Sequence, residues 1–284
     1  MALQIKHNGY TPDWQGRDLL LPAQGLDTYD TVWGGTVSYD FARSDTPALA
    51  PNVVHNGDTI QSLRTGAGPI TAVQVQGGNT TPWMQNNHSA QGLDLSTSQY
   101  NNLRLPDALD LLTLGDKPSV VIWAMFKCVS VPASSRSLIF HGRLSQGAYS
   151  QWVMNHGVTA NFGMQIGSAG GKTDIGYAAG NLVAGTEYLA SLFVQKISDT
   201  QFTAHSYLNG TKLGTATRAY PFNDPTDYNL ADVPSIGISG GTSGVMSCVL
   251  RRMGRRQVDP DSYTVADHEA WIAEQIAANA ARWA

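Results

Sequence analysis

Runs of β-branched and aromatic residues, separated by short turn-forming segments, recur along most of this 284-residue chain. The longest runs are Ser119–Val131 and Tyr188–Ile197. A third run, Phe202–Leu208, is followed by Asn209-Gly210, a dipeptide typical of β-hairpin turns. Strands at this roughly 8–12-residue spacing predict an all-β sandwich or barrel. The other strands predicted in this part of the chain are Ser137–His141, Gln151–Met154, Phe162–Ile166, Lys212–Thr217, Ser235–Ser239 and Val245–Met253.

The charged-residue content excludes a mostly helical fold. Charged residues make up only 14% of the chain, against roughly 25% in an average domain. Glutamate, a strong helix former, occurs only at Glu187, Glu269 and Glu274. One terminal helix is predicted over residues 264–282, with Thr264 as its N-cap and Asp267 completing a capping-box variant.

The first 87 residues differ from the rest, because turn formers such as Asn8-Gly9, Gly34-Gly35 and Asn56-Gly57 dominate them. The apolar content of this part is thin for an independent core. We therefore predict an N-terminal arm or small β-subdomain for assembly over residues 1–87, and the main domain over residues 88–284. The strands expected before the boundary are Thr36–Phe41, Thr59–Leu63 and Ile70–Gln76.

The net charge of −4 shows no electrostatic footprint for nucleic acid, and no apolar run approaches the roughly 20 residues that span a bilayer. The segment that begins at Met1 has no apolar h-region, so we expect synthesis in a cytoplasm without a secretion signal. Cys128 and Cys248 lie in apolar strand-like runs. They are interpreted as buried free thiols, which could lie on neighbouring strands.

The order of several motifs carries a family resemblance. The hairpin Tyr207-Leu208-Asn209-Gly210-Thr211-Lys212-Leu213-Gly214 precedes the glycine-rich stretch 234–241, the strand 244–253 and the terminal helix. Over residues 88–284 this order resembles the concanavalin A-like lectin/glucanase superfamily in its laminin-G-like version. The resemblance implies a jelly roll of two stacked antiparallel sheets, ending in the helix.

Glucanases of that superfamily use paired carboxylates, commonly Glu-x-Asp-x-x-Glu on one strand, and no such motif occurs here. Phosphate-loop and His-Glu-x-x-His signatures are missing as well. We therefore expect a protein that is not an enzyme. The aspartates considered for a carboxylate pair all lie in turn-like surroundings: Asp174, Asp199, Asp224, Asp227 and Asp232.

Sugar binding requires aromatic rings that stack on pyranose faces, together with side chains that hydrogen-bond hydroxyl groups. The candidate glycan-binding residues are Trp83, Tyr149, Trp152 and Tyr177 for stacking, with Arg143, Asn155 and Asn161 for hydrogen bonds. For Trp152 the competing interpretation is a core side chain. No cofactor is expected unless calcium binds the loop that carries Asp224, Asp227 and Asp232, and turn formation is the favoured explanation of these residues.

Four arginines form the only basic cluster: Arg251, Arg252, Arg255 and Arg256. We interpret them as a solvated strand edge that discourages edge pairing, with a nucleic-acid patch or a contact to an acidic neighbour as alternatives.

Low charge, scarce cysteine and an assembly arm before a lectin-like domain resemble bacteriophage structural proteins with laminin-G-like domains. The predicted function is a non-enzymatic virion protein of the tail, baseplate or capsid surface, which assembles with copies of itself and other virion proteins. Attachment to host-surface polysaccharide is the function that a lectin-like domain would add. The alternative is a free carbohydrate-binding lectin outside any virion.

Overall fold

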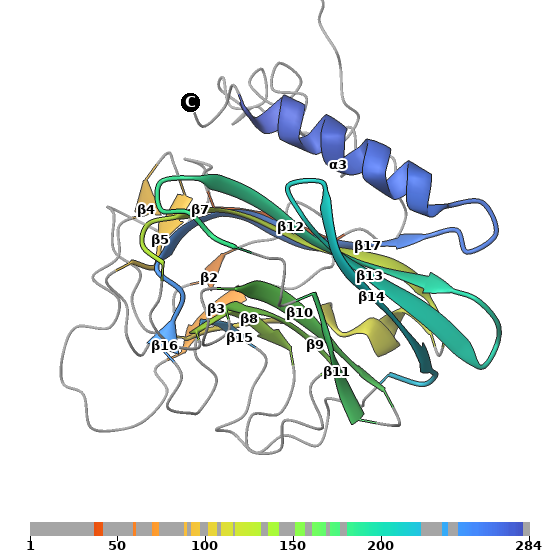
Figure 1. Cartoon of the computed structure of the whole chain (residues 1–284). Coiled ribbons are helices and arrows are strands. Elements are labelled where there is room, and N and C mark those ends of the chain that lie inside the picture. Colours follow the sequence, from red (N-terminus) through yellow and green to blue (C-terminus); the bar gives the residue numbers. More distant parts are fainter. Residues whose placement is uncertain are drawn as a thin grey trace, which may run out of the picture.

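The computed structural model shows two β-sheets packed face to face, with one long helix lying across the outer face of one sheet (Figure 1). The predicted fold class, an all-β antiparallel sandwich with a C-terminal helix, is confirmed. The structure describes residues 37–41, 59–60, 70–73, 88–89, 92–96, 102–106, 109–115, 117–131, 136–141, 151–156, 161–168, 171–176, 181–222, 235–237 and 244–280.

The eight-stranded sheet has its longest strands at its centre. Its order is β14 (Thr211–Ala219), β13 (Gln201–Leu208), β12 (Glu187–Lys196), β7 (Ser119–Cys128), β17 (Cys248–Val258), β5 (Gly92–Asp94) and β4 (His88–Ser89), and β1 (Val37–Asp40) also pairs with β17. Every pairing in this sheet is antiparallel. The predicted turn between β13 and β14 is present, with Asn209 and Gly210 at φ of 48° and 79°.

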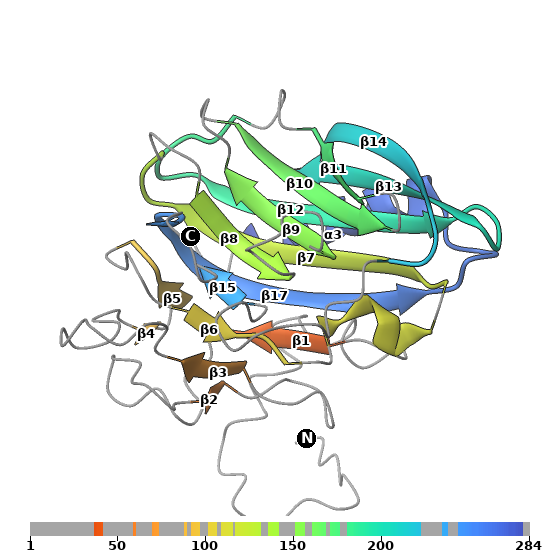
Figure 2. The same cartoon turned by 90° about the horizontal axis from the view of Figure 1, so that it is seen from below.

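The nine-stranded sheet forms the second layer and is seen from its outer side in Figure 2. Its order is β11 (Gly171–Ile175), β10 (Phe162–Ser168), β9 (Trp152–His156), β8 (Arg136–His141), β15 (Ser235–Gly237), β6 (Asn102–Arg104), β3 (Ile70–Val73) and β2 (Thr59–Ile60). The short β16 (Gly244–Val245) joins β8 in parallel, and the other pairings are antiparallel.

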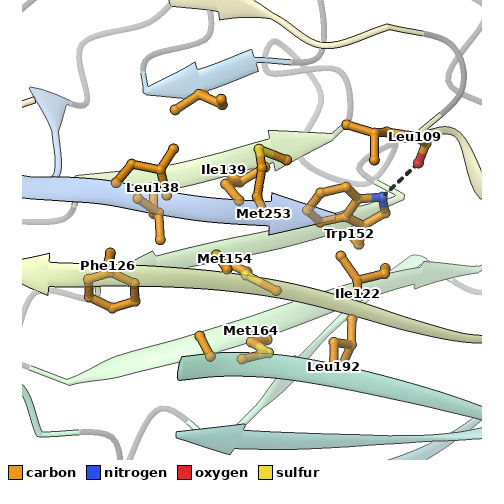
Figure 3. Close-up of a cluster of buried hydrophobic side chains, with 14 of the residues drawn as sticks. Leu109, Ile122, Phe126, Leu138, Ile139, Trp152, Met154, Met164, Leu192 and Met253 are labelled. Atoms are coloured by element: carbon orange, nitrogen blue, oxygen red, sulfur yellow. Dashed lines mark hydrogen bonds between the residues drawn. The ribbon is translucent and has the colours of Figure 1, made fainter. Parts of the chain in front are cut away.

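The main core fills the space between the two sheets. Alternate residues of β7, among them Ile122 and Phe126, face Met154 of β9 (Figure 3). Phe162 of β10 belongs to the same core. The Phe126 and Phe162 rings lie 5.5 Å apart. This burial follows from the strand geometry, since successive side chains point to opposite faces of a sheet.

The other face of β7 is covered by α3 (Val265–Ala280). Trp123 of β7 meets Trp271 of the helix edge-to-face at 5.7 Å, and Ile272 is buried beside them. The predicted capping box is confirmed, because Thr264 N–H donates to the Asp267 carboxylate at 2.8 Å and Asp267 N–H donates to Thr264 Oγ1 at 3.3 Å. A strand with both faces buried reads as one long apolar run, which explains the composition of β7.

Three described segments before residue 88 belong to the sheets. β1 pairs with β17, and β3 pairs with β2 and β6. The division into an assembly arm over residues 1–87 and a main domain over residues 88–284 stays a prediction. Within the described segments, no helix is long and apolar enough to cross a membrane.

Candidate functional site

A row of polar side chains crosses the outer face of the nine-stranded sheet. Asn155 of β9 alternates with the core residue Met154, and Gln165 of β10 alternates with Met164 and Ile166. Asn161 immediately precedes β10 and has the same parity as Gln165. Side chains of alternate strand residues share a face, so these amides point away from the core.

Asp174 of β11 extends this row to the edge of the sheet. It pairs with Gln165 in the strand register, and Gln165 Nε2 donates to the Asp174 carboxylate at 2.7 Å. We call Asn155, Asn161, Gln165 and Asp174 the polar row. The first three side chains are half-buried and Asp174 is exposed.

Glycines lie within the polar row. Gly163 pairs with Asn155, and Gly167 has the same parity as Gln165 on β10. Both glycines are buried, and so is Val153, which pairs with Gln165 and has the same parity as Asn155. The arrangement offers amide donors, amide acceptors and one carboxylate on rigid strands.

The structure describes only some of the glycan-binding candidates that the sequence suggested. Asn155 and Asn161 lie on one face, two residues apart in the register of β9 and β10, and Asn161 also forms a bridge with Asn181. Gln165 and Asp174 were not among the candidates. The alternation of Phe162–Ser168 would have revealed Gln165, whereas Asp174 lies in a strand and not in the turn-like surroundings expected for it.

Trp152 is part of the core. Its side chain is fully buried, and its indole N–H donates to the Leu109 carbonyl at 3.4 Å (Figure 3). No ring face is left for a pyranose, so Trp152 adopts the core role that was its competing interpretation.

The remaining candidates lie outside the described residues. These are the glycan candidates Trp83, Arg143, Tyr149 and Tyr177, and the calcium candidates Asp224, Asp227 and Asp232. Among the residues that are described, no group of three or more His, Cys, Asp or Glu side chains could hold a metal ion.

The arginine cluster is not a solvated edge, and that interpretation was wrong. β17 lies inside the eight-stranded sheet, and all four arginines are buried. Arg251, at a bulge, forms an ion pair with Glu187 at 2.5 Å. Arg256 lies under α3, with its guanidinium 4.7 Å from the Trp271 ring and 5.0 Å from the Tyr263 ring. Aromatic faces offset the cost of burying this cation.

Arg255 points the other way, into the space between the sheets. It donates to Thr113 Oγ1 at 2.9 Å, and burial lowers its pKa to about 10 while the charge of Asp110 opposes that shift. Asp110 in turn accepts from Gln151 Nε2 at 2.6 Å, and Gln151 Oε1 accepts from Leu111 N–H at 2.7 Å. These contacts fasten the 3-10 helix η2 (Leu111–Leu114) to the chain just before β9.

A serine and a histidine meet beneath α3, but not as a nucleophile site. Ser191 Oγ lies 3.0 Å from His268 Nε2, and both side chains are fully buried. Burial, reinforced by Arg256, lowers the pKa of His268 to about 3. The carboxylate of Glu269 accepts from Tyr207 at 3.0 Å and not from the histidine. The docked helix closes this pair off from a substrate, and within the described segments no carboxylate is hydrogen-bonded to the ring.

Comparisons with known proteins address the fold alone. No known family model matches the sequence, and no curated protein matches it. Among solved structures, Trypanosoma rangeli sialidase aligns with 86% of this chain at 11% identity and a TM-score of 0.48, and this chain covers 33% of that protein. The same sialidase in complex with 2,3-difluorosialic acid, a covalent intermediate, gives 10% identity and a TM-score of 0.49 over 85% of this chain and 33% of that one.

A smaller neighbour is the CBM40 of Ruminococcus gnavus IT-sialidase bound to α2,3-sialyllactose. It has 17% identity and a TM-score of 0.38, over 63% of this chain and 90% of that one. This chain therefore covers about a third of the length of the sialidase. It covers most of the length of the binding module. At these identities and scores the likeness concerns the β-sandwich and assigns no activity.

Proposed function

We propose that this chain is a non-enzymatic binding module that recognises glycans with the outer face of its nine-stranded sheet. The observation that carries the proposal is the polar row. Amides and a carboxylate hydrogen-bond sugar hydroxyl groups as donors and acceptors, and strands hold them in fixed positions.

The other broad face is not available for a ligand. α3 lies across the outer face of the eight-stranded sheet and buries Trp123, Phe193 and Tyr207. A ligand that binds a sheet face of this sandwich therefore meets the nine-stranded sheet.

A binding role without catalysis is supported by how the reactive groups are used. Glu187 is paired with Arg251, Glu269 with Tyr207, and the Ser191–His268 contact is sealed beneath the helix. Each of these groups has a structural partner. Bond cleavage instead needs an accessible acid, base or nucleophile.

We further propose that the module works in a bacteriophage virion, as a tail, baseplate or capsid-surface protein. The support is the composition of the chain, which is low in charge and in cysteine. In this role the protein assembles with copies of itself and with other virion proteins. Its ligand in that setting is a host-surface polysaccharide.

A glycan array tests the binding proposal directly. The array includes α2,3- and α2,6-sialyllactose, neutral oligosaccharides and bacterial surface polysaccharides. We expect binding to at least one of them, and no release of smaller sugars on prolonged incubation. Absence of binding to every glycan contradicts the proposal, and sugar release contradicts its non-enzymatic part.

Variants then locate the site. Gln165→Ala and Asp174→Ala remove polar-row side chains, and each should weaken binding about tenfold, the effect of losing one hydrogen bond to a charged or polar group. The matched controls are Gln201→Ala and Asp199→Ala, two exposed positions at the β12–β13 hairpin of the other sheet. Equal affinities for the row variants and their controls would remove the polar row from the site.

The virion proposal has its own test. Mass spectrometry of purified phage particles should detect the protein, and the isolated chain should form stable oligomers. A monomer that is absent from particles and binds a defined oligosaccharide would favour the free lectin.

A further inference from the structure

Two cysteines face each other at the ends of two neighbouring strands of the eight-stranded sheet. Cys128 is the last residue of β7 and Cys248 is the first residue of β17, and the strand register places them directly opposite. Both are free and fully buried. Their neighbours in the same register, Phe126 and Leu250, face the main core, and both cysteines belong to that core.

The hydrogen bonds identify what kind of antiparallel pair the two cysteines form. Val129 N–H donates to the Ser247 carbonyl at 2.9 Å, so the hydrogen-bonded pair lies one residue away. Cys128 itself bonds on its other side, donating to Thr186 at 3.0 Å and accepting from Gly185 at 2.7 Å. Cys128 and Cys248 are therefore a non-hydrogen-bonded pair.

The backbone hydrogen bond of Cys248 also identifies a non-hydrogen-bonded pair. Its carbonyl accepts from Leu95 N–H at 2.8 Å, on the edge of β17 that faces away from β7. In a non-hydrogen-bonded antiparallel pair the Cα atoms lie about 4.5 Å apart and the side chains approach closely. Disulfides span Cα separations of roughly 4.4–6.8 Å.

We propose that Cys128 and Cys248 form a reversible cross-strand disulfide that ties β7 to β17 when the protein meets a disulfide oxidant. This inference goes beyond the glycan-binding proposal and does not depend on it. The register, the pair type and the shared face carry it, and all three are properties of the backbone that already exist in the reduced protein.

The chemistry balances with glutathione disulfide as the oxidant. One cysteine thiolate attacks the oxidant, forms a mixed disulfide and releases one reduced glutathione. The second thiol loses its proton and attacks the mixed disulfide, which forms the Cys128–Cys248 bond and releases a second reduced glutathione. The protein loses two hydrogens, and one glutathione disulfide is reduced.

Burial makes the first step slow, and the strand ends provide the route to it. Burial raises the pKa of both thiols, and the nearby Cys128 adds to the rise at Cys248. The chain reaches the surface directly after Cys128, with Val129 exposed to 42% and Ser130 exposed. Local opening of these ends exposes the first thiol, and the fold then holds the second thiol beside it.

The test compares the folded chain with the chain in urea. Each is incubated with glutathione disulfide under nitrogen, quenched with acid and analysed by intact mass and peptide mapping. We expect the folded monomer to lose two hydrogens and to yield one peptide pair joined through Cys128 and Cys248. The folded state should also favour the crosslink over the mixed disulfide at least about tenfold more than the unfolded chain does.

Three results would overturn the proposal: thiols that stay reduced in the folded protein, a glutathione adduct that never resolves to the crosslink, or a disulfide between two chains. Cys128→Ser and Cys248→Ser should each stop at the mixed disulfide. The wild-type masses decide the question even where those variants do not fold. Oxidation should raise the thermal midpoint by about 5 °C, and dithiothreitol should reverse the rise. A midpoint that oxidation leaves unchanged would contradict the tie between β7 and β17.

Discussion

Acid should weaken the fold through two histidines buried on the outer face of the eight-stranded sheet. His268 of α3 stacks on Trp271 with ring centroids 5.4 Å apart, and His205 of β13 stacks on Phe193 at 5.8 Å. Burial lowers the pKa of His268 to about 3 and that of His205 to about 4. The charges facing these rings are Arg256 for His268, and Lys212 and Glu269 for His205.

Proton linkage explains why acid lowers the free energy of unfolding. In the unfolded chain both histidines bind a proton near pH 6.5, whereas in the folded chain they stay neutral well below that pH. Their contribution to the free energy of unfolding is fully present above pH 6.5 and is lost as the pH falls toward the pKa values of the folded state. Between pH 7.5 and pH 5 each histidine should remove about 2 kcal/mol from the free energy of unfolding, so the two together remove about 4 kcal/mol.

Urea unfolding at a series of pH values between 7.5 and 5 measures this loss. His268→Gln and His205→Gln should each reduce the pH-dependent part by about 2 kcal/mol, whatever each substitution costs at pH 7.5. Gln201→Ala, which changes an exposed residue that does not titrate, should follow the wild-type curve. A pH dependence that neither histidine variant alters would refute the assignment of buried neutral rings. Carboxylates with lowered pKa values, such as Asp267, act below this window and do not obscure it.

Three further predictions concern unfolding free energies measured in urea. Gly254→Ala should lower the free energy of unfolding by about 1–3 kcal/mol, because the added Cβ would lie 2.6 Å from the Trp123 ring. An unchanged urea midpoint would show that the neighbouring strands β1 and β7 move apart to make room for the methyl group. Thr264→Ala removes the cap of α3 and should cost about 1 kcal/mol, with a matching loss of helical circular dichroism and a Thr264→Ser control that retains stability. Glu187→Gln leaves Arg251 with a neutral partner and should cost about 1–2 kcal/mol, a modest value because the Glu187 side chain is 37% exposed; a gain in stability would mean that the buried arginine is satisfied elsewhere.

The strands and the helix were readable from local patterns, and most of them lie where expected. β12 occupies Glu187–Lys196 against a predicted Tyr188–Ile197, and α3 occupies Val265–Ala280 against residues 264–282. β17 ends at Val258, five residues beyond the predicted end at Met253. The prediction stopped early because the stretch that follows Met253 begins with a glycine and continues with two arginines and Gln257. Charged residues rarely occupy interior strands, so the local pattern gave no reason to extend it.

The candidate site was only partly readable. Asn155 and Asn161 were chosen for their side chains alone, and the register placed them on one face with Gln165 and Asp174. The pairing of Asn155 with Gly163 and of Gln165 with Asp174 depends on where each hairpin turns, and a one-residue slip would send these side chains to the core.

Local sequence patterns were enough to establish that this chain forms strands rather than helices, where its hairpin turns lie, and that one capped helix ends the described part. These features depend on neighbouring residues, through propensity, alternation and capping. Long-range packing was needed to establish that β17 runs through the interior, that its arginines are covered by α3 and η2, and that Cys128 faces Cys248. Those facts depend on which distant strands become neighbours, and alternation along a strand identifies its two faces without saying what will cover them.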